Sequence, residues 1–128
     1  MVLKIITAHE AKSGTNIMID GEPYTVRNVD ISKTGKHGAS KCRIEAISIM
    51  NGQKKILAVP GHERFDVPLV DKRKAQVLSL GDKISIMDLE SFETLEIDCD
   101  EEIRKTLEEN SNVEYWDIEG RKIIKRKQ

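Results

Sequence analysis

The sequence of 128 residues is long enough for one ordinary domain or for two very small ones. Its formal net charge of −1 does not by itself indicate a nucleic-acid-binding protein. This value is the sum of two halves of opposite charge, since residues 1–69 carry +3 and residues 70–128 carry −4. No apolar run approaches the roughly 20 residues that cross a bilayer, and the apolar start is too short for a signal peptide, so we expect a soluble, cytoplasmic protein.

Strand patterns dominate the first half of the chain. Segments 16–20 and 22–32 flank Asp20-Gly21, a pair that favours a two-residue hairpin turn because both positions tolerate positive φ. Within the second segment the alternation of apolar residues changes phase near Arg27-Asn28. This change predicts a β-bulge, an irregularity that lets a small sheet curl into a barrel.

A second hairpin follows in the same half. Residues 41–50 alternate polar and apolar positions and predict a strand antiparallel to residues 24–32. Asn51-Gly52 predicts a turn into a strand at 54–60, and a short strand at 65–67 comes after a loop. Short strands joined by tight turns are typical of a small β-barrel, here residues 1–69.

The strand pattern restarts at residue 70. Three segments, 74–80, 83–89 and 92–98, predict a meander of three strands. Two further strands are predicted at 113–118 and 121–126, with Glu119-Gly120 as the turn between them.

A short helix is predicted between the third and fourth of these strands, within residues 100–110. Ile103 and Leu107 are spaced i and i+4, and Asp100 is placed to cap the helix N-terminus. Three strands, one helix and two strands is the order of an oligonucleotide/oligosaccharide-binding (OB) barrel. We therefore predict an all-β chain with one short helix and with two modules, residues 1–69 and 70–128.

Motifs for catalysis and metal binding are incomplete. Gly35-Lys36 lacks the earlier glycine, the following Ser or Thr and the helix of a phosphate-binding P-loop. His9-Glu10 lacks the second histidine of a zinc-protease helix, and neither Cys42 nor Cys99 has a metal ligand at a familiar spacing. We predict no catalytic residues, no metal site and free, buried thiols.

The eight acidic residues between Asp88 and Glu102, uninterrupted by Lys or Arg, could form a catalytic dyad or a metal site. Acids at alternating strand positions and at a helix start more often form a solvated face, and this is the interpretation we adopt. Such a face would repel phosphates, so nucleic acid is expected at the first module or at another edge of the second.

The segment 33–43 is the candidate functional segment. Lys33, Lys36, His37, Lys41 and Arg43 are cationic or potentially so, and the segment contains no carboxylate, a pattern typical of a phosphate-facing loop. Flanking glycines leave the backbone around Lys36 unobstructed, and an exposed lysine makes a poor catalytic amine, which usually needs burial. Lys36 is therefore a candidate for presentation to a partner or for modification. A solubilising hairpin loop remains the structural alternative.

Four stretches of the sequence resemble those of a known family: SKTGKHGASKCRIEAISI, DVPLVDKRKAQVLSL, ISIMDLESFETLEI and VEYWDIEGRKIIKR. Together they resemble the archaeal branch of translation factor 5A, the hypusine-containing initiation and elongation factor homologous to bacterial elongation factor P. The resemblance spans essentially the whole chain, and Thr34-Gly35-Lys36-His37-Gly38 is its most specific element. Ser40 departs from the pattern, since the family usually has alanine there.

The resemblance implies an SH3-like barrel over 1–69 and an OB-fold over 70–128. It also implies that deoxyhypusine synthase transfers an aminobutyl group from spermidine to Lys36, giving deoxyhypusine or hypusine. Thr34, Gly35, His37 and Gly38 would form the recognition segment around that lysine.

The same resemblance implies a function in translation. The factor would bind rRNA between the ribosomal P and E sites and reach the peptidyl-tRNA, helping peptide-bond formation at stalling sequences such as polyproline. Lys33, Lys41 and Arg43 would contact RNA phosphates. The expected protein is a monomeric, non-enzymatic factor with no bound cofactor and no membrane partner.

Two alternatives stay open at this point. One is a generic two-barrel RNA-binding or RNA-chaperone protein that acts without modification. The other is a small enzyme that uses the acidic face between Asp88 and Glu102.

Overall fold

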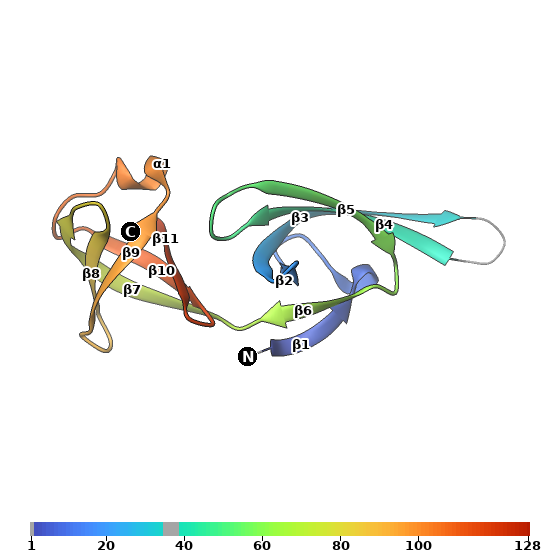
Figure 1. Cartoon of the computed structure of the whole chain (residues 1–128), viewed down its shortest axis with the longest axis horizontal. Coiled ribbons are helices and arrows are strands. Elements are labelled where there is room, and N and C mark those ends of the chain that lie inside the picture. Colours follow the sequence, from blue (N-terminus) through green and yellow to red (C-terminus); the bar gives the residue numbers. More distant parts are fainter. Residues whose placement is uncertain (1, 35–38) are drawn as a thin grey trace. The chain divides into compact units, whose positions relative to one another are not determined.

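The computed structural model describes residues 2–34 and 39–128. The chain forms two compact units, residues 1–69 and residues 70–128 (Figure 1). Strands make up most of both units, and the helical part of the second is short, so the predicted all-β fold class with one short helix is confirmed. Within the described ranges, no helix has the length and apolar character needed to cross a membrane.

The first unit contains six strands and one 3₁₀ turn. They are β1 (Val2–Thr7), η1 (Ala8–Glu10), β2 (Asn16–Ile19), β3 (Glu22–Thr34), β4 (Ala39–Ser48), β5 (Lys54–Pro60) and β6 (Arg64–Pro68). Four strands form an antiparallel sheet in the order β2-β3-β4-β5, and β1 pairs with β6. The two sheets share one apolar core, in which Ile17, Val26 and Ile44 are fully buried.

Both predicted features of the first hairpin are present. Asp20 and Gly21 have φ values of 52° and 79°, the positive values that a two-residue turn between β2 and β3 requires. The β3–β4 register shifts between Val26 and Asn28, so Arg27 is the bulged residue. Figure 1 shows β3 and β4 continuing side by side beyond this point as a long hairpin.

The predicted alternation along β4 is also confirmed. Cys42, Ile44 and Ala46 are buried in the core of the first unit, while Lys41 and Arg43 are exposed. One face of the strand therefore anchors the sheet, and the other presents cations to solvent.

The second unit is a closed five-stranded barrel. Its elements are β7 (Val70–Leu80), β8 (Ile84–Asp88), β9 (Thr94–Cys99), α1 (Glu101–Arg104), β10 (Asn112–Ile118) and β11 (Arg121–Lys127). The strand order around the barrel is β7-β8-β9-β11-β10, and β10 pairs back with β7. Every pairing is antiparallel except that of β9 with β11, the connectivity expected of an OB barrel.

Helix α1 is one turn long, shorter than the span of residues 100–110 whose periodicity predicted it. Asp100 is the predicted N-cap, and its side chain accepts a hydrogen bond from the Glu102 backbone N–H at 2.9 Å. The helix ends because the Thr106 hydroxyl and backbone N–H both donate to the Ile103 carbonyl, which the Leu107 N–H would otherwise use. Ile103 and Leu107 nevertheless pack against the barrel core.

Candidate functional site

The end of the β3–β4 hairpin carries the residues singled out from the sequence. Its strands stay paired up to Lys33 with Ser40 and Thr34 with Ala39. Lys36, the predicted modification site, lies outside the described residues, as do Gly35, His37 and Gly38. The described part of the site is therefore the pair of strands that leads into and out of this segment.

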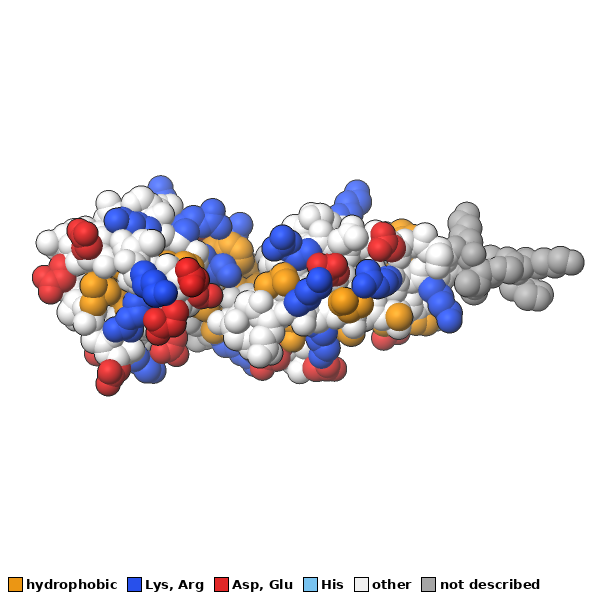
Figure 2. Space-filling model, turned by 90° about the horizontal axis from the view of Figure 1, so that it is seen from above, with side chains coloured by type: hydrophobic (Ala, Val, Ile, Leu, Met, Phe, Trp, Pro, Cys, Tyr) orange, Lys and Arg blue, Asp and Glu red, His pale blue; other side chains and the backbone are white. Residues whose placement is uncertain are grey.

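Lys41 and Arg43 lie on the solvent side of β4. Figure 2 shows several Lys and Arg side chains on the surface of the first unit. The Arg43 guanidinium lies 3.7 Å from a carboxylate oxygen of Asp30, and about half or more of each side chain is exposed. An exposed pair at this distance contributes little stability, so a phosphate can compete for Arg43. The structure thus brings together two of the three cations predicted to contact RNA, and it gives the backbone position of the third, Lys33, in β3.

Three residues from separate segments meet near the loop end of this hairpin, and we call them the hairpin anchor: His9, Ser40 and Gly61. The His9 Nε2 atom is hydrogen-bonded to the Ser40 hydroxyl. The Gly61 N–H donates to the Ser40 carbonyl at 2.9 Å, and the His9 N–H donates to the Gly61 carbonyl at 3.1 Å. The anchor ties the start of β4 to η1 and to the β5–β6 connection.

The hairpin anchor leaves no room for a side chain at Gly61. A Cβ atom there would overlap the His9 ring and the Ser40 hydroxyl. The sequence indicated Ser40 only as a departure from a family pattern, and it gave no signal for the other two. No local pattern could have found them, because the three residues are distant in the chain.

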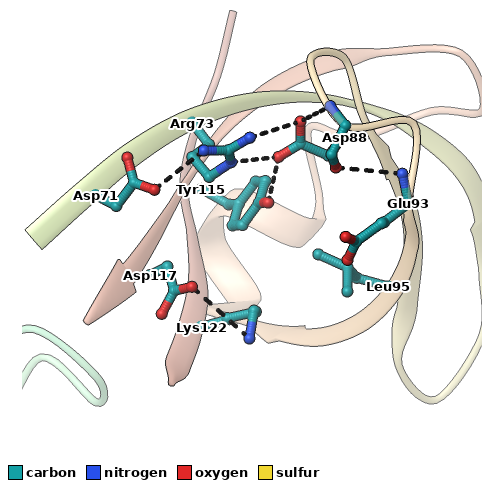
Figure 3. Close-up of a pocket in the computed structure, with 9 residues that line it drawn as sticks. Asp71, Arg73, Asp88, Glu93, Leu95, Tyr115, Asp117 and Lys122 are labelled. Atoms are coloured by element: carbon teal, nitrogen blue, oxygen red, sulfur yellow. Dashed lines mark hydrogen bonds and ion pairs between the residues drawn. The ribbon is translucent and has the colours of Figure 1, made fainter. Parts of the chain in front are cut away.

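A second candidate site is a polar pocket of about 330 Å³ in the barrel (Figure 3). Its lining includes the residues Asp71, Arg73, Asp88, Ser91, Glu93, Leu95, Tyr115, Asp117 and Lys122. At its wall Asp88 is completely buried, and Figure 3 shows the Arg73 guanidinium and the Tyr115 hydroxyl pointing at its carboxylate.

The Asp88 carboxylate accepts hydrogen bonds from two side chains and two backbone N–H groups. Arg73 donates from Nε at 2.5 Å and from Nη2 at 3.2 Å, and the Tyr115 hydroxyl donates at 2.5 Å. The backbone N–H groups of Glu90 and Ser91 donate at 2.8 and 2.9 Å. The Arg73 hydrogen bonds hold the pKa of Asp88 well below its usual range, and burial together with the Asp88 charge raises the pKa of Tyr115.

This arrangement does not favour acid–base chemistry. At neutral pH Asp88 is ionised, Tyr115 is protonated, and the carboxylate has little remaining capacity to accept a proton or bind an ion. The network instead ties the β8–β9 turn to β7 and β10, so its function is structural.

The solvated-face interpretation of the acidic stretch is thus wrong for Asp88, although Glu90, Glu93, Glu96 and Asp98 are exposed as expected. The sequence did contain a signal. Asp88 continues the period of two set by Ile84 and Ile86, both fully buried, so the alternation points it into the core.

The two cysteine thiols are the next candidates for chemistry. Both are free, as predicted, and Cys42 is buried, whereas Cys99, which was also predicted to be buried, is only partly so. Burial raises the pKa of Cys99 to about 11, which keeps it protonated at neutral pH. In the described part of the chain, no three His, Cys, Asp or Glu side chains are grouped as metal ligands would be.

Comparisons with known proteins cover both units. Residues 4–62 match the family model described as "Translation initiation factor 5A-like, N-terminal". The translation initiation factor 5A of Metallosphaera sedula is 46% identical over 129 residues, which cover 98% of each chain. That of Pyrococcus horikoshii is 41% identical over 126 residues, covering 94% of this chain and 91% of its own.

Solved structures agree with the sequence matches. The structure titled eukaryotic translation initiation factor 5A from Methanococcus jannaschii aligns with a TM-score of 0.85 at 39% identity, over 98% of this chain and 94% of that one. A translation initiation factor eIF-5A family protein from Naegleria fowleri aligns with a TM-score of 0.80 at 29% identity, over 100% and 99% of the two chains.

Proposed function

Because the chain belongs to the translation initiation factor 5A family and is a translation factor, we propose that it promotes peptide-bond formation on stalled ribosomes. It binds rRNA near the P and E sites and contacts the peptidyl-tRNA, with its largest effect at consecutive prolines. It acts in the cytoplasm as a monomer, without catalysis of its own and without a membrane partner.

Lys36 is the working residue of this proposal. Deoxyhypusine synthase extends it with an aminobutyl group from spermidine, and the product is deoxyhypusine or hypusine. Thr34, Gly35, His37 and Gly38 form the recognition segment for the synthase. No other cofactor is involved.

The lengthened side chain works by positioning. With an added amine it reaches between nucleotides and contacts the phosphate–sugar backbone at the acceptor end of the tRNA. Ordering the reacting ends lowers the entropic part of the barrier, so no chemical group has to be donated.

The β3–β4 pairing that continues to Thr34 and Ala39 is the observation that carries this proposal. It fixes the backbone on both sides of the segment containing Lys36, and the hairpin anchor holds Ser40 close to that segment. Exposed Lys41 and Arg43 on the same hairpin supply cations for rRNA or tRNA phosphates, with Lys33 as the third.

Translation of a polyproline message in a reconstituted system tests the proposal. Modified wild-type protein should stimulate synthesis, and Lys36→Arg should abolish the stimulation because arginine cannot accept the aminobutyl group. Lys41→Arg is the matched control, since it keeps the charge on the same hairpin and should remain active.

Mass spectrometry of the native protein supplies a second readout. We expect the peptide containing Lys36 to carry the aminobutyl addition. Unmodified Lys36 in native protein, together with a fully active Lys36→Arg variant, would overturn the proposal and favour a generic RNA-binding or RNA-chaperone protein.

A further inference from the structure

The outer wall of the barrel carries the only tryptophan of the chain, Trp116 in β10. Its neighbour Tyr115 belongs to the barrel core and reaches Asp88, so Trp116 lies on the opposite, outer side of the strand. Trp116 is nevertheless only 8% exposed. Two lysine contacts to its ring contribute to this low exposure.

Two lysines cover that ring. Lys72, the cross-strand partner of Trp116 in β7, places its Nζ atom 4.7 Å from the ring centroid. Lys125 in β11 places its Nζ atom 5.1 Å from the same centroid. These distances are typical of cation–π contacts, which hold an ammonium group in place without neutralising its charge.

Two further cations lie on the strands on either side of β10, on the same outer side as Trp116. Lys74 and Arg126 are the cross-strand partners of Glu114, which lies two residues from Trp116 and so on the same side of β10. We call the set Lys72, Lys74, Glu114, Trp116, Lys125 and Arg126 the Trp116 face. In Figure 2, Lys and Arg side chains gather beside hydrophobic ones on one side of the second unit.

The single carboxylate of the Trp116 face is already engaged. Glu114 accepts a hydrogen bond from the Trp116 indole N–H at 2.9 Å and lies 3.2 Å from the Arg126 guanidinium. The nearby acids Asp71 and Asp117 have the opposite phase and line the Asp88 pocket. The six residues of the face therefore have a net charge of +3 within a unit whose overall charge is −4, although Asp100 also interacts electrostatically with Lys125.

The wall that OB barrels usually offer to nucleic acid has the opposite character here. That wall is formed by the second and third strands, which are β8 and β9 in this barrel. Its exposed side chains include Glu96 and Asp98, which would repel phosphates. The cations of the Trp116 face lie instead on β7 and β11, the two strands that pair with β10.

We propose that the Trp116 face binds the phosphate backbone of duplex RNA. With Lys72 and Lys125 over it, the indole ring is not free to stack on an unpaired base, as single-strand recognition on aromatic platforms requires. The lysine ammonium groups held over it can donate to phosphate oxygens, which position RNA without reading its sequence. This site is separate from the Lys36 hairpin, and the inference does not depend on modification of Lys36.

Titration of the full-length, unmodified protein with a short RNA duplex tests the proposal. Trp116 fluorescence should change on binding, because the ring is in contact with both lysines. Anisotropy of labelled duplex over a range of salt concentrations gives affinity and the number of phosphate contacts. Lys72→Gln with Lys125→Gln should weaken binding and reduce the slope of log affinity against log salt by about 2.

Two control variants locate the effect. Lys83→Gln with Lys105→Gln removes the same charge from exposed positions elsewhere in the second unit and should bind with a nearly unchanged slope. Lys41→Gln with Arg43→Gln in the first unit should lower affinity while leaving the Trp116 fluorescence change intact. Near-ultraviolet circular dichroism checks that each variant keeps its fold.

Three results would overturn the proposal. The first is a wild-type salt slope for the Lys72 and Lys125 double variant. The second is duplex binding that leaves Trp116 emission unchanged. The third is a fluorescence change with single-stranded RNA or with polyglutamate but not with duplex, which would assign the face to base stacking or to an acidic protein.

Discussion

At the scale of single residues, the Asp88 network shows how one carboxylate holds three elements. Five donated hydrogen bonds satisfy it completely, and Arg73 would be left without its main partner if the carboxylate were lost. Removing one member of a buried ion pair is strongly destabilising, because the other charge stays behind in a low-dielectric site.

We therefore expect Asp88→Asn to destabilise the second unit by about 3 to 5 kcal/mol. The amide has the same size but donates where Arg73 and Tyr115 also donate. Tyr115→Phe removes one hydrogen bond and should cost only about 1 kcal/mol. Denaturant unfolding followed by Trp116 fluorescence measures both, and equal stability of Asp88→Asn and wild type would contradict the expectation.

The stability of the wild-type protein and that of Asp88→Asn should depend differently on pH. The pKa of Asp88 is lowered in the folded state, so its contribution to stability is complete above its unfolded-state pKa of about 3.9 and is lost as pH falls further. The stability difference between wild type and Asp88→Asn should shrink below about pH 4. A difference that stays constant through this range would show that the Asp88 charge is not the cause.

At the scale of elements, the hairpin anchor ties the start of β4 to η1 through backbone hydrogen bonds, and the side chains of His9 and Ser40 occupy the space that a Cβ atom at position 61 would need. The alternating pattern of β4 sets which side chains face solvent, and the anchor sets where the strand begins. Both are needed to present the segment that contains Lys36.

Gly61→Ala should destabilise the first unit by about 1 to 3 kcal/mol, because the added methyl group displaces His9 or Ser40. Thermal unfolding followed by far-ultraviolet circular dichroism measures the loss. Gly81→Ala is the matched control, because a Cβ there would meet only ordinary contacts, and it should change stability little. An unaffected Gly61→Ala protein would show that the anchor yields easily.

At this scale, the sequence predicts the features that depend on neighbouring residues and misses those that depend on contacts between distant segments. Asp20-Gly21, the bulge at Arg27 and the Asp100 cap act within a few residues, so local patterns predicted them. The β1–β6 pairing and the parallel β9–β11 pairing join distant segments, and no local pattern specifies them. Lys41 and Arg43 were placed correctly on the solvent side because alternation is local, whereas His9 and Gly61 reach the site only through the fold.

At the scale of the whole molecule, each unit has a core of its own. The buried cluster of the first unit lies entirely within residues 1–69 and that of the second entirely within residues 70–128. The opposed charges of the two halves, visible in the sequence, therefore belong to separately stabilised bodies.

A fragment of residues 70–128 should accordingly fold alone, since its strands close on themselves and its core cluster consists of its own residues. Its Trp116 emission and its denaturation midpoint should match those of the second unit in the full chain. A fragment that is unfolded at neutral pH would mean that residues 1–69 supply stability to the barrel.

Closure of the barrel by β11 has a consequence for how the protein is made. β11 is the last strand in chain order, and it fills the gap between β9 and β10. A nascent chain emerging from its N-terminal end can complete the first unit early, whereas the second stays an open sheet, with β9 and β10 as unpaired edges, until β11 is released. Vectorial synthesis therefore completes the β3–β4 hairpin of the first unit before the barrel of the second unit can close.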